Sequence, residues 1–274
     1  MKISEAILNG KRKLEKVSDA SLLEAEVLFS FVMGKSKEYI LARYDTEVSK
    51  EILEKFFTLI KKRESGIPLP YLTHKREFMN LDFYINESVL IPRQETESLV
   101  EKALSIANNE KVHILDIGTG SGCILISFLF YNKLSTGIGI DISKKAVEIA
   151  LKNAKNIGVL NRARFINIDF RKFKSKEKFD LILTNPPYVM EKELKNIPFE
   201  PKIALDGGIS GMEIYPELTK KSYLLLKDGG TFITEIDYRN ARKILNIIKQ
   251  IGFSNVKLLK DLTGRDRFLI GVKK

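Results

Sequence analysis

The tetrapeptide Asn185-Pro186-Pro187-Tyr188 has the composition of a site that holds a planar amino group. It follows the apolar run 179–184, and two prolines cannot continue a buried strand because they remove backbone donors and fix φ. An NH2 group has two N–H donors. The side-chain carbonyl of Asn185 and the backbone carbonyl of Pro186 can accept one each, while Tyr188 packs against the flat group. The tetrapeptide therefore predicts a rigid, polar turn that fixes one nitrogen atom.

Such a turn is suited to methylation of a conjugated amino group, whose delocalised lone pair makes it a poor nucleophile. Holding the nitrogen in line with an activated methyl group can contribute about 7–11 kcal/mol, so positioning supplies most of the catalysis. A glutamine amide, an adenine N6 and a guanine N2 all present a nitrogen of this kind. The tetrapeptide thus predicts the reaction class and leaves the substrate open.

A glycine-rich turn provides the second part of the chemistry. Gly118-Thr119-Gly120-Ser121-Gly122 directly follows the apolar run 112–117 and precedes a helix. Glycines permit positive φ and close approach of a ligand, and the N–H groups at the helix start face that ligand. The third glycine comes one residue earlier than in the dinucleotide fingerprint. The turn therefore favours S-adenosylmethionine, with S-adenosylhomocysteine as the product.

Acidic residues at two further strand ends complete the expected cofactor site. Asp141 ends the strand candidate 137–141, where a carboxylate can accept hydrogen bonds from a ribose diol. Asp169 and Phe170 follow the candidate 163–168, where the acid can accept from an adenine amino group and the ring can cover the base. The chain has one Cys and two distant His residues, so no metal site is expected.

The elements that must position these residues alternate between strand and helix from residue 111 onward. Several strands are nearly continuous apolar runs, which is typical of parallel strands covered on both faces. This alternation predicts an α/β, doubly wound sheet whose ligands bind at the carboxyl ends of the strands, where 179–184 should adjoin 112–117. The remaining strand candidates are 230–236, 255–260 and 267–272, and the helices are expected at about 121–131, 143–157, 213–226 and 238–251.

The first part of the chain has a different pattern. Apolar residues recur at helical spacing in 4–16, 21–33 and 49–64, and Ser21 with Glu24 has the spacing of a capping box. Two prolines interrupt this pattern, and alternating apolar residues over 76–85 then predict a β-hairpin, followed by a strand end before Pro92. We expect three regions: a helical domain at 1–66, a hairpin linker at 67–91 and a catalytic domain at 92–274.

Composition and charge exclude some classes of protein. The longest mainly apolar run, 123–130, is far too short for a membrane span, and the first 20 residues lack a signal-peptide core. A cytoplasmic protein is therefore expected. The net charge of +11 is concentrated at 144–178, which has 11 Lys or Arg against 3 Asp or Glu. Such a stretch can be a solvated surface or can meet an acidic partner or nucleic acid.

The chain resembles the HemK/PrmC protein-(glutamine-N5) methyltransferases, which methylate the glutamine of the Gly-Gly-Gln motif in peptide chain release factors. The resemblance covers nearly the whole sequence and is carried by six segments. Two of them, 89–101 and 200–215, are the most particular to this family. The segments are VLIPRQETESLVE at 89–101, LDIGTGSG at 115–122, GIDIS at 139–143, NPPYV at 185–189, EPKIALDGGISGMEIY at 200–215 and LTGRDRFLIG at 262–271.

The resemblance implies a Rossmann-like S-adenosylmethionine-dependent methyltransferase domain with a seven-stranded, mostly parallel sheet. It also implies a small all-α N-terminal domain that binds the release factor, and a β-hairpin linker. Carried over by position, the glycine turn with Asp141 binds the cofactor, Phe170 lies near adenine, and the Asn-Pro-Pro-Tyr turn holds the substrate glutamine. The long irregular segment 200–211 is expected to cover the substrate.

The resemblance further implies that Arg93, Thr96 and Glu97 line or close the pocket, in a segment where the family usually has proline in place of Gln94. From the residues alone, Thr96 can equally be a helix N-cap followed by an acid that favours the helix dipole.

One alternative function stays open, an adenine-N6 or guanine-N2 nucleic-acid methyltransferase, because the tetrapeptide is shared with such enzymes and the net charge is +11. Residues 1–66 have a net charge of only +2 and no stripe of Arg with aromatic residues, which counts against a nucleic-acid substrate. The two intact motifs count against an inactive binding protein. We expect a monomer whose partner is a release factor.

Overall fold

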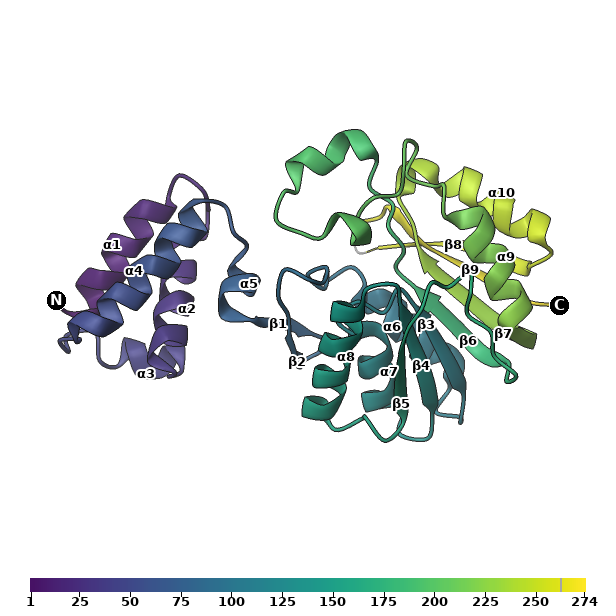
Figure 1. Cartoon of the computed structure of the whole chain (residues 1–274), viewed down its shortest axis with the longest axis horizontal. Helices are drawn as coiled ribbons and strands as arrows, with labels where there is room; N and C mark the ends of the chain where they lie inside the picture. Colours follow the sequence, from purple (N-terminus) through teal and green to yellow (C-terminus); the bar gives the residue numbers. More distant parts are fainter. Residues whose placement is uncertain (262) are drawn as a thin grey trace. The chain divides into compact units, whose positions relative to one another are not determined.

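The computed structural model describes residues 1–261 and 263–274, and the chain divides into two compact units, Met1–Lys75 and Arg76–Lys274 (Figure 1). Leu262, the first residue of the segment 262–271 singled out above, lies outside the described residues. Within the described part of the chain, none of the helices has the length and apolar character that a bilayer-spanning segment needs.

The first unit is a small helical bundle with its own apolar core. Phe29 of the second helix meets Phe56 of the fourth edge-to-face at 5.0 Å between ring centroids. Gly10 allows the first helix to approach, because a Cβ there would lie 2.8 Å from the Phe56 ring. The helices are α1 (Ile3–Leu14), α2 (Ser21–Met33), α3 (Lys37–Leu41), α4 (Lys50–Glu64) and α5 (Leu69–Thr73).

The capping box predicted at the start of α2 is wrong. Ala20 occupies the N-cap position, and Ser21 is already inside the helix with its side chain buried. Glu24 instead pairs with Arg63 of α4, with an Nε–Oε2 distance of 2.8 Å. The tertiary ion pair thus uses the carboxylate that the local pattern assigned to capping. At its other end α2 stops at Gly34, whose φ of 61° is left-handed.

The second unit contains a seven-stranded sheet in the order β5-β4-β3-β6-β7-β9-β8, which confirms the predicted fold class. All neighbours are parallel except the two pairs that involve β9. β6 pairs with β3, as predicted, so the strand order reverses there. The strands are β3 (His113–Ile117), β4 (Thr136–Asp141), β5 (Ala163–Asn167), β6 (Phe179–Thr184), β7 (Leu226–Glu235), β8 (Ser254–Lys260) and β9 (Asp266–Val272).

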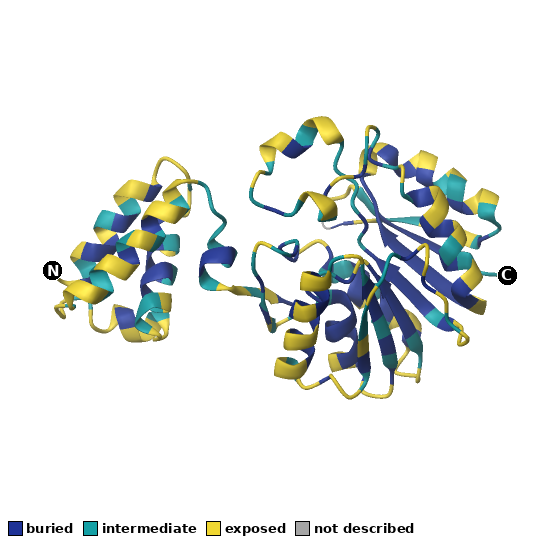
Figure 2. Ribbon diagram, viewed as in Figure 1, coloured by how far each residue is buried: buried dark blue, intermediate teal, exposed yellow. Residues whose placement is uncertain are grey.

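Helices cover both faces of this sheet (Figure 1). α6, α7 and α8 lie on one face, and α9 and α10 lie on the other. The central strands β3, β6, β7 and β9 are buried over most of their length, whereas β5 and β8 are more exposed (Figure 2). The helices are α6 (Glu97–Ala107), α7 (Cys123–Tyr131), α8 (Lys144–Ile157), α9 (Tyr215–Leu225) and α10 (Ala241–Ile251), with short 3-10 turns η1 (Glu191–Asn196), η2 (Lys202–Ala204) and η3 (Tyr238–Asn240).

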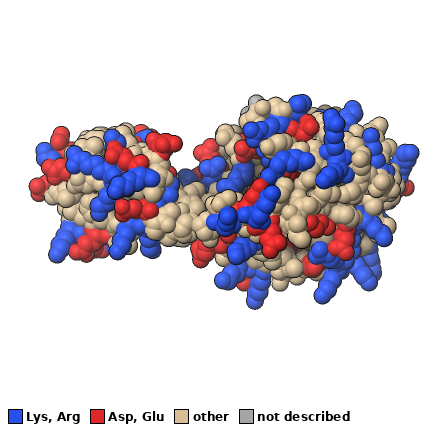
Figure 3. All heavy atoms as spheres, turned by 90° about the horizontal axis from the view of Figure 1, so that it is seen from above, with Lys and Arg blue, Asp and Glu red and all other residues tan. Residues whose placement is uncertain are grey.

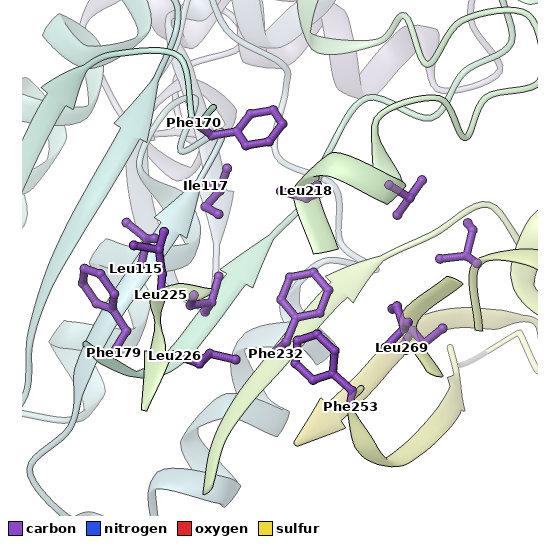
Figure 4. Close-up of a cluster of buried hydrophobic side chains, with 14 of the residues drawn as sticks. Leu115, Ile117, Phe170, Phe179, Leu218, Leu225, Leu226, Phe232, Phe253 and Leu269 are labelled. Atoms are coloured by element: carbon purple, nitrogen blue, oxygen red, sulfur yellow. The ribbon is translucent and has the colours of Figure 1, made fainter. Parts of the chain in front are cut away.

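A large apolar cluster fills the space between the sheet and the helix layer formed by α9 and α10 (Figure 4). Leu115 of β3, Phe179 of β6, Phe232 of β7 and Leu269 of β9 contribute to it, so four neighbouring strands share one core. Phe170, from the loop after β5, lies at one end of the cluster in this view. The core therefore reaches the edge of the sheet at which the predicted site residues lie.

The predicted hairpin is present as β1 (Lys75–Phe78) and β2 (Leu81–Tyr84). Its turn residues, Met79 and Asn80, both have left-handed φ, at 52° and 55°, which matches the twist of a tight hairpin. Asn153 of α8 holds the hairpin by exchanging hydrogen bonds with the backbone of Tyr84, at 2.8 and 2.9 Å. The strand end expected before Pro92 is not formed, and residues 85–96 have no regular structure.

Candidate active site

A cavity of about 240 Å³ opens at the carboxyl ends of β3, β4, β5 and β6. Most of the residues singled out from the sequence line it, although they come from five separate segments of the chain. They are Arg93, Thr96, Gly118, Thr119, Gly120, Ser121, Asp141, Asp169, Phe170, Asn185, Pro186 and Pro187. Among the described residues, the lining does not include Glu97, Gly122 or Tyr188.

The glycine turn between β3 and α7 meets the cavity with its backbone. Gly118 and Gly120 have φ of 74° and 55°, which other residues rarely adopt. A Cβ at Gly118 would meet no atom within 4 Å. Glycine is therefore needed there for its positive φ and not for lack of space, and a ligand can approach the backbone. Gly122 has another role: a Cβ there would lie 2.6 Å from the Ile126 side chain and 3.1 Å from that of Ala150, so this glycine lets α7 and α8 pack closely.

Asp141, at the end of β4, is bonded to the glycine turn. Its Oδ2 accepts the N–H of Gly120 at 2.9 Å, and its Oδ1 accepts the N–H of Ser143 at 2.8 Å. Burial raises the pKa of this carboxyl, and the backbone donors oppose that shift. Each carboxylate oxygen has two acceptor sites. Asp141 can therefore hold the turn and still accept hydrogen bonds from a bound diol.

Asp169 and Phe170 are fixed by a residue that the sequence analysis did not single out, Arg171. Its guanidinium lies 3.3 Å from the Asp169 carboxylate, 2.5 Å from that of Glu217 on α9, and 4.8 Å from the centre of the Phe170 ring. Arg171 also lines the cavity. One cation thus orients both the acid and the ring that border the same part of the pocket.

The Asn-Pro-Pro-Tyr turn is connected to α6 and β7 by side-chain hydrogen bonds. Asn185 Nδ2 donates to Thr96 Oγ1 at 3.3 Å, and Thr96 Oγ1 donates to Glu235 Oε2 at 2.7 Å. The Tyr188 hydroxyl donates to the other oxygen, Glu235 Oε1, at 2.9 Å. Thr96 is 2% exposed and Glu235 is 1% exposed, so this network is shielded from water.

Thr96 does stand at the N-cap position of α6, as one interpretation of the sequence expected. Its hydroxyl, however, donates to Glu235 and accepts no hydrogen bond from the first turn of the helix. The neighbouring carboxylate of Glu97 accepts the N–H of Met79 in the hairpin turn, at 2.8 Å. Glu97 therefore fixes the hairpin, while Thr96 faces the cavity.

Glu235 is a site residue that sequence reasoning missed. Burial raises the pKa of its carboxyl, while the hydroxyls of Thr96 and Tyr188 and the charge of Arg267 lower it. The pKa of Tyr188 is raised as well, mainly by burial and to a smaller extent by the charge of Glu235, so the phenol keeps its proton. The available signal was positional: Glu235 is the last residue of β7, which lies beside β6.

The segment 200–211 packs against the Asn-Pro-Pro-Tyr turn. Glu200 forms an ion pair with Arg93 and accepts the N–H of Ile91 at 3.1 Å. A Cβ at Gly207 would lie 2.7 Å from the Cα of Tyr188, and one at Gly211 would lie 2.5 Å from the Tyr188 carbonyl oxygen. The glycines therefore let this segment lie directly on the turn, and its Ile203 and Ala204 line the cavity.

Surface charge is distributed over both units. In the view of Figure 3, both Lys or Arg and Asp or Glu side chains appear on each unit, with areas of other residues between them. At the basic stretch predicted above, Arg171 is engaged by two carboxylates and Lys178 donates to the carbonyl of Leu224. Within the described residues, no group of three or more His, Cys, Asp or Glu side chains is placed to hold a metal ion.

Two family models match this chain. One describes a PrmC N-terminal domain and matches residues 5–73, and the other describes a methyltransferase domain and matches residues 108–259. The second match alone spans more than half of the sequence, so both the fold and the general class of enzyme have independent support.

Curated relatives match over nearly their whole length. A protein of Clostridium acetobutylicum named release factor glutamine methyltransferase is 33% identical, over 100% of this chain and 99% of that protein. A protein of Moorella thermoacetica with the same name is 35% identical, over 92% of this chain and 91% of that protein.

Solved structures share the fold of the sheet-containing part. A methyltransferase from Pyrococcus furiosus superposes with a TM-score of 0.52 at 18% identity, covering 70% of this chain and 89% of that one. A ribosomal protein L11 methylase from Lactobacillus delbrueckii subsp. bulgaricus gives 0.51 at 21% identity, covering 69% and 84%.

Proposed function

Because this chain belongs to the family of release factor glutamine methyltransferases, we propose that it methylates the side-chain amide nitrogen, N5, of the glutamine in the Gly-Gly-Gln motif of a peptide chain release factor. The methyl donor in this proposal is S-adenosylmethionine, with S-adenosylhomocysteine as the product. One observation carries the proposal beyond the family: the glycine turn and the Asn-Pro-Pro turn line the same cavity. A cofactor and an amino group can therefore meet there.

The donor half of the site follows from the fit of the cavity to the cofactor. The open backbone at Gly118 and Gly120 admits the methionine part, and Asp141 has acceptor sites for the two ribose hydroxyls. Asp169 and Phe170 border the place for adenine. When bound, S-adenosylmethionine supplies a methyl group that is activated by its sulfonium centre.

The acceptor half consists of two carbonyl groups. Asn185 Oδ1 and the backbone oxygen of Pro186 accept the two N–H groups of the glutamine amide, which fixes the nitrogen and directs its lone pair toward the methyl group. Both carbonyl dipoles also oppose the positive charge that grows on the nitrogen as the new bond forms. The nitrogen becomes acidic only at that stage and then loses a proton, so the turn needs no strong base.

The remaining parts have supporting roles in the proposal. The segment 200–211, packed on Tyr188, covers the amide and excludes water. The helical unit, which the PrmC N-terminal model matches, binds the release factor at a surface away from its glutamine loop. The expected place of action is the cytoplasm, where release factors work, and the expected form is a monomer.

A labelling experiment tests the function directly. The purified chain is incubated with radiolabelled S-adenosylmethionine and with a release factor, total RNA or DNA in separate reactions. We expect label on the release factor, and no label on a matched factor whose Gly-Gly-Gln glutamine is replaced by alanine. Label on RNA or DNA with none on the factor would instead support the adenine-N6 or guanine-N2 alternative, which the comparisons do not favour.

A further inference from the structure

Asn185 is connected to a buried carboxylate through one hydroxyl group. The amide nitrogen of Asn185 donates to Thr96, and Thr96 donates to Glu235, over 3.3 and 2.7 Å. The three residues come from three elements that are far apart in the chain: the end of β6, the start of α6 and the end of β7. Of the three, only Asn185 belongs to the tetrapeptide that defines the reaction class.

The direction of these hydrogen bonds follows from counting protons. An ionised carboxylate has only acceptor sites, whereas a hydroxyl has one proton to donate. In the structure the Thr96 hydroxyl donates to Glu235 Oε2, so its one proton is used there and the lone pairs of Thr96 Oγ1 remain for Asn185. Only the NH2 half of the Asn185 amide can donate to those lone pairs, so the amide is held in one of its two orientations.

The carboxylate itself is held from its other side. The hydroxyl of Tyr188 donates to Glu235 Oε1 at 2.9 Å, so each carboxylate oxygen has a hydroxyl donor. Tyr188 is fixed in turn because Gly207 and Gly211 pack on its backbone. Among the described residues, no protein group donates to Asn185 Oδ1, and Asn185 lines the cavity. The carbonyl half of the amide is thus the half that a ligand can reach.

We propose that Glu235 and Thr96 are positioning residues that keep the carbonyl oxygen of Asn185, and not its NH2 group, directed at the substrate nitrogen. This inference rests on the proposed function, because it requires a substrate with N–H groups to donate. We call the hydrogen bonds from Asn185 to Thr96 and from Thr96 to Glu235 the relay. If Glu235 is lost, the Thr96 hydroxyl can rotate, and if the hydroxyl is lost, the Asn185 amide has no acceptor. In either case the amide can turn by 180°. The NH2 group of Asn185 would then face the NH2 group of the substrate, and two donors cannot bond.

The principal test compares Thr96→Val with Thr96→Ser. Valine keeps the shape of the side chain but lacks the hydroxyl, whereas serine keeps the hydroxyl. We expect Thr96→Val to lower kcat with a release factor by about tenfold or more, because an acceptor needed in the transition state is lost. KM for the factor should change by no more than about twofold, since the rest of its surface still binds. Thr96→Ser should restore most of the lost turnover.

A second pair of variants tests Glu235. Glu235→Gln keeps an acceptor oxygen for the Thr96 proton, whereas Glu235→Met is similar in length and offers only a weakly accepting thioether sulfur. We expect Glu235→Met to lower kcat much more than Glu235→Gln. The double variant Thr96→Val/Glu235→Met should be no slower than Glu235→Met alone, since both changes break the same relay.

Binding of S-adenosylhomocysteine and the thermal midpoint of each variant separate positioning from general damage. The inference is overturned if Thr96→Val retains kcat within about twofold of the wild type, or if its loss of turnover is matched by an equal loss of cofactor affinity or folding. Failure of the proposed function gives a different result, because the wild-type chain itself would then leave the release factor unlabelled.

Discussion

Asp141 Oδ2 accepts the backbone N–H of Gly120 at 2.9 Å, which joins the end of β4 to the turn that follows β3. The same carboxylate accepts the N–H of Ser143, at the start of α8. An acid placed here has two functions at once, because it shapes the glycine turn and also offers acceptor sites to a ligand. Replacing Asp141 should therefore mainly weaken the binding of the cofactor.

Asp141→Ala should weaken S-adenosylhomocysteine binding by about 10- to 100-fold, the usual range for hydrogen bonds to a charged group. Titration calorimetry measures this, and Asp141→Asn, which keeps one acceptor oxygen, should lose less. Glu148, an exposed acid on α8, gives the control Glu148→Ala, which should bind as the wild type does. Unchanged affinity in Asp141→Ala would rule out the assignment to the ribose diol.

Asn185→Ala should lower kcat by about 100-fold or more, because it removes one of the two acceptors for the substrate amide. Its affinity for S-adenosylhomocysteine should stay within several-fold of the wild type. Asn161→Ala, at an exposed site outside the cavity, is the matched control. Turnover that equals that of the control would mean that the Asn185 carbonyl does not hold the substrate.

Gly207→Ala should reduce turnover by displacing the segment 200–211 from the active-site turn. The new Cβ would lie 2.7 Å from the Tyr188 Cα, and a backbone neighbour cannot move aside as a flexible side chain can. Gly158→Ala is the comparison, because its Cβ would meet open space while its φ of 83° is still unfavourable for alanine. It should lose stability but not turnover. Equal turnover in both variants would show that the segment 200–211 does not depend on this contact.

The stability of the chain should fall as pH rises through the range in which Asp116 ionises. Burial raises the pKa of this carboxyl from 3.8 to about 7, although the Thr119 hydroxyl donates to it at 2.7 Å. Since the folded chain holds this proton more tightly than the unfolded chain, the stabilising effect is complete below the usual pKa and is lost as pH rises toward about 7.

Asp116→Asn cannot ionise, so its stability should depend less on pH. Urea unfolding at about pH 5 and about pH 8 measures the difference, with the wild type losing more free energy of unfolding than the variant between the two conditions. Other titrating groups are shared by the two proteins and cancel in this comparison. Parallel pH profiles would contradict the elevated pKa.

The parts of the site that could be predicted are those in which a local pattern coincides with a strand end. The glycine turn, Asp141 and Asn185 each directly follow an apolar run, and parallel strands bring such ends to one edge of a sheet. The local sequence motifs, together with the alternation of strands and helices, were therefore enough to predict that these residues lie near one another. The same reasoning predicted that β6 adjoins β3, which the strand order confirms.

The contacts that could not be predicted join residues far apart in the chain. Thr96 and Glu235 are 139 residues apart, and Arg93 and Glu200 are 107 apart. A threonine at a helix start and an acid at a strand end each have a sufficient local explanation, so nothing in the sequence pairs them. The wrong capping box at Ser21 has the same origin, because a distant arginine competes for the carboxylate of Glu24.

The two carbonyl groups of the Asn-Pro turn also have a consequence for what the site rejects. A glutamine that has lost its amide nitrogen by hydrolysis becomes a glutamate, which is nearly identical in shape. Its carboxylate has no proton to offer at neutral pH, so in the proposed arrangement it would face two oxygen acceptors and be repelled. The enzyme would thereby act as a checkpoint on its own substrate, marking intact release factors and leaving deamidated ones without the methyl group.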